Sequence, residues 1–289
     1  MYNKYLIMPA LPYANGKIHI GHLLEHIQVN IIVLSLRMYN RKVLYICGTD
    51  AHGTPIELIS AKIKENPINY ISQIRKSHID SFDKFGIIFD YIYGSTHTRS
   101  NRNHIYKIFK NLRERKYIQK KTSKLFYDKK HQRFLSDRLI IGTCPYCKCK
   151  NQYSDNCEAC GGVYDIKHLL LPQSLLSNTS PILKESVNFF FDLPIFEVYL
   201  QKWIFHNNII QKEMINFMDF WIKRGLKQWC ISRNAPYFGF IIPQHKNIFF
   251  YVWMDAPICY ISLSDIVLKM SNSTYKDYWK KKKYTYYIL

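Results

Sequence analysis

Four cysteines form the most specific chemical pattern in the chain. Cys144-x2-Cys147 and Cys157-x2-Cys160 are two CxxC pairs joined by nine residues. This spacing is typical of two knuckles that hold one tetrahedral Zn2+, and four thiolates leave no open coordination position, which predicts a structural ion. Disulfide or redox chemistry is one alternative. Another is a ligand set in which Cys149 replaces Cys147, although the knuckle spacing favours Cys147.

Two histidines are spaced by three residues in His19-Ile20-Gly21-His22, directly after a short apolar run and a Pro-containing turn. Imidazoles at positions i and i+3 share one helix face, and the start of a helix offers free N–H groups to an anion. The pair could therefore stabilise charge that develops on a phosphate, and Gly21 would let a flat ring approach the backbone. The alternative is two histidines on a partly exposed helix face.

One carboxylate follows the second predicted strand, in the segment Asp50-Ala51-His52-Gly53-Thr54-Pro55. A carboxylate at the carboxyl end of a sheet strand can bind the ammonium group of a substrate. An aspartate before a proline is also a common helix cap, so Asp50 alone does not decide between the two roles.

Aromatic and small residues alternate in Tyr251-Val252-Trp253-Met254-Asp255-Ala256-Pro257, which Tyr260 follows. An aromatic slot of this kind suits a flexible thioether, because contacts between sulfur and aromatic rings are favourable. A buried strand with a turn is the alternative interpretation.

The apolar pattern predicts the elements that position these residues. Strands are expected at 4–10 and 43–47, with a helix at 18–38 between them. Strand, helix and strand in this order predict a right-handed crossover and a parallel sheet. Further helical patterns cover 56–64, 68–85, 103–116 and 194–225, and short strands such as 248–253 follow. The residue composition and patterning change near residues 116 and 229. This predicts an α/β sheet interrupted by an inserted domain, with domains 1–115, 116–228 and 229–289.

The charge of the chain favours a polyanionic partner, nucleic acid first. The 289 residues include 41 Lys and Arg against 21 Asp and Glu, a formal net charge of +20. The abundance of Ile, Asn, Tyr and Lys also fits an AT-rich coding sequence, so basicity alone is weak evidence. No run of about 18 apolar residues and no signal-peptide pattern occurs, which predicts a cytoplasmic protein with no membrane partner.

These motifs together resemble one known family. Residues 10–30, with Leu11-Pro12-Tyr13-Ala14-Asn15-Gly16 and the HIGH motif, are similar to the signature region of the methionyl-tRNA synthetases, which are class I aminoacyl-tRNA synthetases. Residues 50–55, residues 251–260 and the cysteine pairs also match, and the resemblance extends to about Tyr287. It implies a Rossmann-like sheet of the HIGH-type nucleotidyl transferases, with an inserted zinc-containing connective domain.

The resemblance implies a role for each motif. His19, Gly21 and His22 would bind ATP, and both histidines would act in adenylate formation. Methionine would be bound by Leu11, Tyr13, Asp50, Trp253, Ala256, Pro257 and Tyr260, with Asp50 on the α-amino group. The implied partners are methionine, ATP with Mg2+, and tRNA(Met), and the cofactor is a structural Zn2+. The reaction would be adenylation of methionine followed by its transfer to the tRNA.

In the family the chain continues into the rest of the sheet, the KMSKS loop and an anticodon-binding domain. Lys269-Met270-Ser271-Asn272-Ser273 is similar to KMSKS, but it precedes a segment, Tyr275 to Trp279, that resembles a family segment upstream of that loop. We therefore expect a surface connection there and a solvated charge run at Lys280 to Lys283.

Three interpretations follow. The chain could be the N-terminal part of a methionine–tRNA ligase that a second polypeptide completes, or an inactive remnant. It could also be a non-enzymatic zinc-containing tRNA-binding protein that uses Lys120, Lys121 and Lys124.

Overall fold

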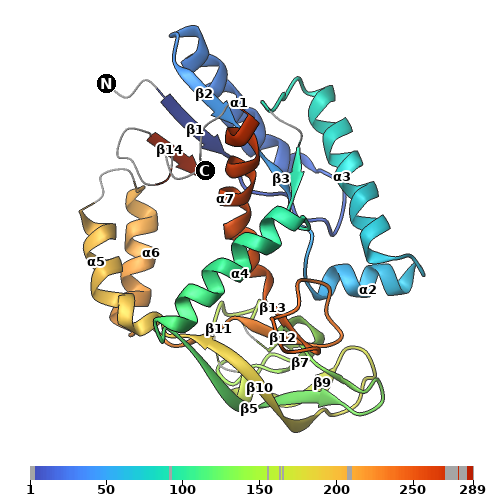
Figure 1. Cartoon of the computed structure of the whole chain (residues 1–289). Helices are drawn as coiled ribbons and strands as arrows, with labels where there is room; N and C mark the ends of the chain where they lie inside the picture. Colours follow the sequence, from blue (N-terminus) through green and yellow to red (C-terminus); the bar gives the residue numbers. More distant parts are fainter. Residues whose placement is uncertain are drawn as a thin grey trace. The chain divides into compact units, whose positions relative to one another are not determined.

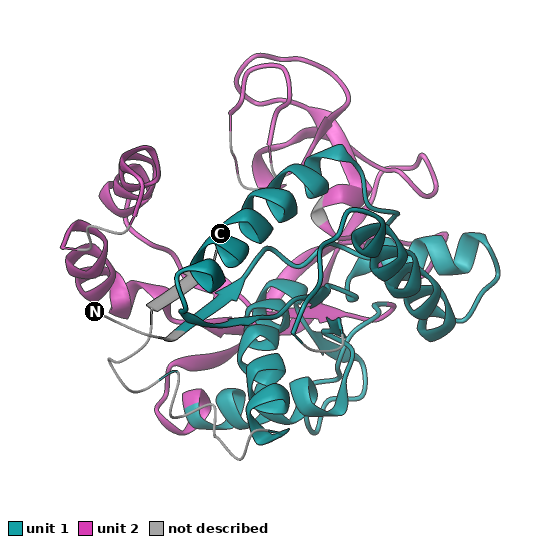
Figure 2. Ribbon diagram, turned by 90° about the horizontal axis from the view of Figure 1, so that it is seen from above, with its two compact units in different colours: residues 1–111, 237–289 teal, residues 112–236 magenta. Residues whose placement is uncertain are grey.

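The computed structural model describes residues 4–90, 93–154, 156–162, 164, 166–206, 210–270, 279 and 285–288 (Figure 1). The chain divides into two compact units. The first comprises residues 1–111 and 237–289, and the second residues 112–236 (Figure 2). Among the residues described, no helix is long and apolar enough to span a membrane. The segments 271–273, 275–278 and 280–283, where a surface connection and a charge run are predicted, lie outside them.

A parallel sheet forms the centre of the first unit. Its strand order is β14 (Thr285–Ile288), β1 (Lys4–Met8) and β2 (Lys42–Tyr45), and both pairs are parallel. Helix α1 (Ile20–Met38) connects β1 to β2, so the predicted helix at 18–38 and the parallel sheet are confirmed. Because β2 lies on one side of β1 and β14 on the other, the strand order reverses at β1. Open α/β sheets bind ligands at such a switch point, beyond the carboxyl ends of the strands.

Strand β1 is buried on both faces of the sheet. Leu6 and Met8 pack in one cluster with residues of α7 (Val252–Met270), and Ile7 packs in another with residues of α1. The alternation follows from the two-residue period of a strand. Burial of each such side chain stabilises the fold by about 1.5–3 kcal/mol. The packing fixes the carboxyl end of β1, where the HIGH segment begins.

The other elements of this unit carry the remaining site residues. They are β3 (Gly48–Thr49), α2 (Thr54–Lys62), α3 (Pro67–Lys84), β4 (Gly94–Ser95), α4 (Arg99–Glu114) and β13 (Ile248–Phe250). The helices predicted at 56–64, 68–85 and 103–116 are confirmed as α2, α3 and α4. The strand predicted at 248–253 is wrong beyond Phe250, because α7 begins at Val252. The continuous apolar run there has no periodicity that separates a strand from a buried helix.

The second unit is built on two antiparallel sheets. The larger has the order β11 (Trp229–Cys230), β10 (Ile182–Phe191), β5 (Ile118–Asp128) and β6 (Arg133–Phe134). The smaller has the order β8 (Gln152–Tyr153), β7 (Ile140–Thr143) and β9 (Leu170–Ser174). Residues 194–225 contain two helices, α5 (Glu197–Phe205) and α6 (Lys212–Lys223). Strand β12 (Ser232–Asn234) and three short 3-10 turns, Asp137–Leu139, Ile166–His168 and Leu193–Phe196, complete the unit.

Candidate functional site

The two histidines of the HIGH motif cap helix α1. His19 is the N-cap residue, and its Nδ1 accepts a hydrogen bond from the Gly21 N–H at 3.1 Å. In return, the His19 N–H donates to Nδ1 of His22 at 3.3 Å. This reciprocal arrangement is a capping box in which imidazoles replace the usual hydroxyl and carboxylate. The two rings also stack, with centroids 3.8 Å apart.

The capping box fixes where the ring protons lie. Since Nδ1 of each ring accepts a hydrogen bond, a neutral imidazole at either position carries its proton on Nε2. Burial lowers the pKa of His22, and the nearby His19 and His78 lower it further, so His22 is neutral at pH 7. The start of α1 thus presents ring N–H donors together with its helix dipole, an arrangement suited to phosphate oxygens.

Close packing explains the glycine between the two histidines. A Cβ on Gly21 would lie 3.0 Å from Cε1 of His19, so the His19 ring rests directly against this backbone. The sequence predicts that Gly21 makes room for a flat ring, and in the structure the imidazole of His19 lies against it.

A third histidine, which sequence reasoning missed, anchors the turn before α1. His78 of α3 is fully buried, and its Nε2 donates to the carbonyl oxygen of Gly16 at 3.0 Å. Its Nδ1 accepts from the Thr49 hydroxyl at 3.1 Å. Burial lowers the pKa of His78, in keeping with a neutral ring. No local pattern marks this residue, because its partners are distant in the sequence.

The loops after β1 and β3 are joined at Tyr13 and Asp50, two of the predicted site residues. The Ala14 N–H donates to the Asp50 carbonyl oxygen at 2.7 Å, and the Asp50 N–H donates to the carbonyl oxygen of Pro12 at 2.9 Å. The hydroxyl of Tyr13 lies 2.7 Å from where a Cβ on Gly53 would be. Gly53 also has a φ of +121°, so both space and backbone conformation require glycine there.

The Asp50 carboxyl lies in an environment that disfavours its charge. Burial raises its pKa to about 7, and the nearby carboxylate of Asp255 contributes, while His52 acts in the opposite direction. Oδ1 of Asp50 is screened from solvent and has no hydrogen-bond partner among the described residues. A buried acceptor without a donor costs about 1–3 kcal/mol. A cationic group that reached this oxygen would remove that cost.

A second buried carboxylate lies close to Asp50 and belongs to a chain of hydrogen bonds. Nδ1 of His52 is 2.9 Å from Oδ2 of Asp255, and both side chains are fully buried. Nε2 of His52 is in turn 2.9 Å from Nδ1 of His97. Sequence reasoning assigned no role to these three residues, although His52 and Asp255 lie inside segments that it singled out.

The structure brings only some of the predicted methionine residues together. Leu11 and Tyr260 pack against the same cluster of β1 and α7, and the Tyr260 hydroxyl donates to the Pro9 carbonyl oxygen at 3.2 Å. Trp253 is 65% exposed, and Pro257 is exposed as well, in the first turns of α7. Ala256 is half-buried between them. Trp253 therefore does not close a slot around a ligand in this state.

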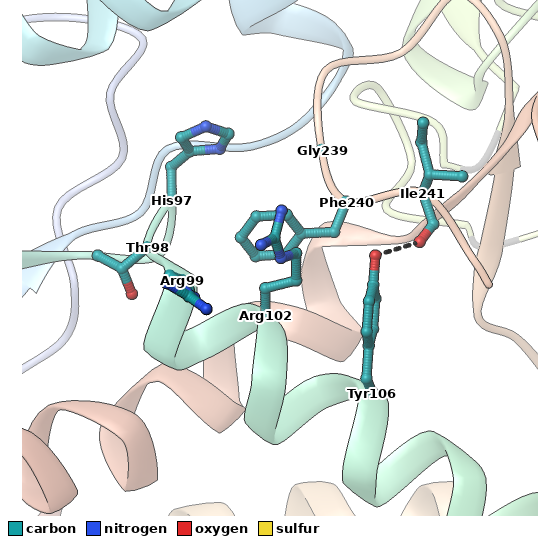
Figure 3. Close-up of a pocket in the computed structure, with 8 residues that line it drawn as sticks. All are labelled: His97, Thr98, Arg99, Arg102, Tyr106, Gly239, Phe240 and Ile241. Carbon is teal, nitrogen blue, oxygen red and sulfur yellow. Dashed lines mark hydrogen bonds between the residues drawn. The ribbon is translucent and has the colours of Figure 1, made fainter.

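A cavity of about 300 Å³ opens beside His97, at the start of α4 (Figure 3). Arg99 and Arg102, in the first turns of α4, line the cavity. Tyr106 lines it as well, and its hydroxyl donates to the carbonyl oxygen of Ile241 at 3.0 Å. The ring of Phe240 lies parallel to that of His97, with centroids 5.4 Å apart. His97 therefore has the buried His52 on one side and this open space on the other.

The four predicted zinc ligands form one thiol cluster in the second unit. Their sulfur atoms all lie within 4.8 Å of one another, with 3.9 Å from Cys144 to Cys160 and 3.5 Å from Cys147 to Cys157. Four sulfurs at about 2.3 Å from a tetrahedral Zn2+ are about 3.8 Å apart, so the donor set fits this ion. All eight cysteines carry free thiols. Cys149 lies outside the cluster, which favours Cys147 over Cys149 as the fourth ligand.

Comparison with known proteins identifies the family. The family model described as tRNA synthetases class I (M) matches residues 5–289. The chain belongs to this family. Among curated class I (M) synthetases, the methionine–tRNA ligase of Buchnera aphidicola subsp. Schizaphis graminum is 47% identical over 281 residues, and that of subsp. Baizongia pistaciae is 44% identical over 282. Each match covers 97% of this chain and 51% of the relative, so the chain spans about half the length of these synthetases.

Solved structures show the same class I synthetase fold. The Mycobacterium tuberculosis methionyl-tRNA synthetase bound by methionyl-adenylate matches with a TM-score of 0.72 and 18% identity, over 96% of this chain and 50% of the other. A second structure of that enzyme with methionyl-adenylate gives the same TM-score over 98% of this chain and 51% of the other. The expected α/β class I fold is thereby confirmed.

Proposed function

We propose that this chain contains an activation site for methionine, at which methionine and ATP react to give methionyl-adenylate and pyrophosphate. The observation that carries the proposal is the histidine capping box at the start of α1, placed where the strand order of the sheet reverses. The adjoining loop holds a carboxyl oxygen, Oδ1 of Asp50, that has no hydrogen-bond partner in the described part of the chain. A donor set for phosphate and an acceptor for ammonium are the two requirements of this reaction. The names of the curated relatives support methionine as the amino acid.

In the proposed mechanism the protein positions the reactants and stabilises charge. His19 and His22 donate hydrogen bonds to phosphate oxygens as the methionine carboxylate attacks the α-phosphate and pyrophosphate leaves. Gly21 allows this cap to form. Asp50 accepts from the methionine ammonium group, and the proposed side-chain pocket comprises Leu11, Tyr13, Trp253, Ala256, Pro257 and Tyr260. Magnesium would arrive with ATP, without a dedicated protein site.

The thiol cluster is proposed to hold a structural Zn2+ through Cys144, Cys147, Cys157 and Cys160. The metal would cross-link the two turns of the second unit that carry the CxxC pairs, and it would have no part in the chemistry, because thiolates occupy its four positions.

Transfer of methionine to tRNA(Met) is the second half of the proposed function. The curated relatives are about twice as long as this chain, so further sequence, such as a second polypeptide, could contribute to tRNA binding and anticodon recognition. We place the activity in the cytoplasm, as part of the same proposal.

The decisive experiment is methionine-dependent exchange between ATP and pyrophosphate by the purified chain. We expect exchange in the wild type and its loss in His22→Ala, because that variant loses a ring donor and the acceptor of the His19 N–H in the capping box. His206→Ala, at an exposed position in the second unit, is the matched control. Exchange that survives in His22→Ala would contradict the assigned role. Absence of exchange in a folded wild-type chain would contradict activation by this chain alone.

A second candidate function, RNA binding by the second unit, is favoured by one observation. Lys120, Lys121 and Lys124 are exposed on β5, where they could reach phosphates. Reversal of these three charges should weaken the binding of tRNA and make it less sensitive to salt. Unchanged binding would exclude this surface.

A further inference from the structure

Two carboxylates near the switch point each have one buried oxygen atom whose hydrogen-bonding capacity is not satisfied by the described residues. Oδ1 of Asp50 and Oδ1 of Asp255 are both screened from solvent and have no hydrogen-bond partner among the described residues. The two groups are close enough for the charge of Asp255 to raise the pKa of Asp50. A cationic ligand would satisfy both of these buried acceptors, for which the described residues offer no donor.

Asp255 is held rigidly, although no described residue donates a hydrogen bond to its Oδ1. His52 binds Oδ2 at 2.9 Å, and Nδ2 of Asn101 donates to the backbone carbonyl oxygen of Asp255 at 3.5 Å. Oδ1 of Asn101 in turn accepts from the Ser262 hydroxyl at 3.1 Å. The other nitrogen of His52 is occupied by His97. Neither His52 nor Asp255 can therefore rotate without breaking a buried hydrogen bond.

We propose that Asp255 is the second carboxylate of the ammonium site and that His52 is the positioning residue that holds it there. The inference rests on the proposed function, since the ammonium group is that of the amino acid which Asp50 is assigned to bind. An ammonium group has three N–H donors, so it can satisfy Oδ1 of both aspartates and still donate once more. The pair would favour a free amino acid over a compound that lacks the amino group.

The charges around the site agree with this arrangement. When both carboxyl groups are ionised, the site carries negative charge that a cationic ligand would balance. Tyr13 and Cys259 lie near both aspartates: burial raises the pKa of each group well above its usual value, and the charges of Asp50 and Asp255 raise it further. Arg102 acts on His97, whose pKa burial lowers to about 4, with further lowering by His52 and Arg102.

The test compares two ligands on matched variants of the whole chain. Methionine and 4-(methylthio)butanoate share the thioether and the carboxylate but differ in the ammonium group, and calorimetry gives the affinity of each. Asp255→Asn keeps the shape of the side chain and removes its charge. Asp265→Asn is the control, since Asp265 lies on the same helix but pairs with Lys269 at 2.8 Å. Among His52 variants, Asn keeps a donor near the position of Nδ1 and Leu removes it.

We expect Asp255→Asn and His52→Leu to weaken methionine binding about tenfold and to leave the deaminated compound unaffected, because a charge-assisted hydrogen bond is lost. Asp265→Asn should bind both like the wild type, and His52→Asn should recover most of the loss. Equal weakening of both ligands, or no weakening of methionine, would overturn the proposal. NMR titration of the Asp50 carboxyl distinguishes failure of this proposal from failure of the proposed function. If the wild type binds no methionine, the proposed function fails. If the Asp50 titration is unchanged in Asp255→Asn, the pairing of the two carboxylates fails as well.

Discussion

The environment of Asp50 predicts that methionine binding depends steeply on pH near neutrality. Burial and the charge of Asp255 raise the pKa of this carboxyl from its usual 3.8 to about 7. Only the ionised form attracts an ammonium group, so a bound methionine must first displace a proton at lower pH. The perturbation is therefore a change of pH from 6.0 to 7.5, applied to the wild type and to Asp50→Asn.

The magnitude follows from the ionised fraction. A carboxyl with a pKa of about 7 is ionised in roughly one molecule in eleven at pH 6 and in about three in four at pH 7.5. The association constant should therefore rise about eightfold, which corresponds to ~1.2 kcal/mol. A carboxyl with an ordinary pKa would be ionised throughout this range and would give a flat profile.

Calorimetry in two buffers of different ionisation enthalpy measures both the affinity and the protons released. We expect release of nearly one proton per methionine at pH 6 and much less at pH 7.5. Asp50→Asn should bind weakly and without pH dependence. The reasoning is refuted if the wild-type affinity is constant over the range, or if Asp50→Asn keeps the same slope, since another group would then be responsible.

Three further predictions concern stability, the metal and the ring protons. The folded chain holds the Asp50 proton more tightly than the unfolded chain, so the free energy of unfolding should fall as pH rises from about 4 to 7. Urea unfolding at pH 7.5 should show that Asp50→Asn is more stable than the wild type by up to about 4 kcal/mol. Metal analysis should find about one zinc per chain, lost in Cys147→Ser and retained in Cys149→Ser; the reverse result would show that Cys149 is the ligand. Nitrogen-15 NMR should find the Nε2–H tautomer for neutral His19 and His22, with a depressed pKa for His22, and Nδ1–H signals would contradict the capping box.

The elements that position the site were predictable because their patterns are local. The helical spacing of apolar residues after the first strand predicted α1, and its histidines lie at its start as expected. The segments of Tyr13 and Asp50 each follow a predicted strand, and the structure joins these two residues in a parallel bridge. Where that periodicity is missing, as in the apolar run around Trp253, the start of α7 was predicted as strand.

The interactions that set the chemistry were not predictable, because they join residues far apart in the sequence. His52 and Asp255 are separated by 203 positions, and nothing in either segment marks them as partners. His78 reaches Gly16 across 62 positions. The raised pKa of Asp50 depends on burial that only the folded chain creates. Residue types at short spacing therefore identify the ligand chemistry, while the long-range contacts decide how each group is charged.

The position of β14 in the sheet has a consequence for synthesis on the ribosome. Strand β1 pairs with β2 early, but its other edge pairs with residues 285–288, at the far end of the chain. At about 5–20 residues per second, roughly 12–50 s of translation separate these two events. During that time one edge of the central strand β1, which carries the apolar residues Leu6, Ile7 and Met8, has its backbone N–H and C=O groups free, the condition under which sheet edges pair with the wrong strand. Slow codons or chaperone binding over this interval would thus affect the yield of folded protein more than changes after β14 is complete.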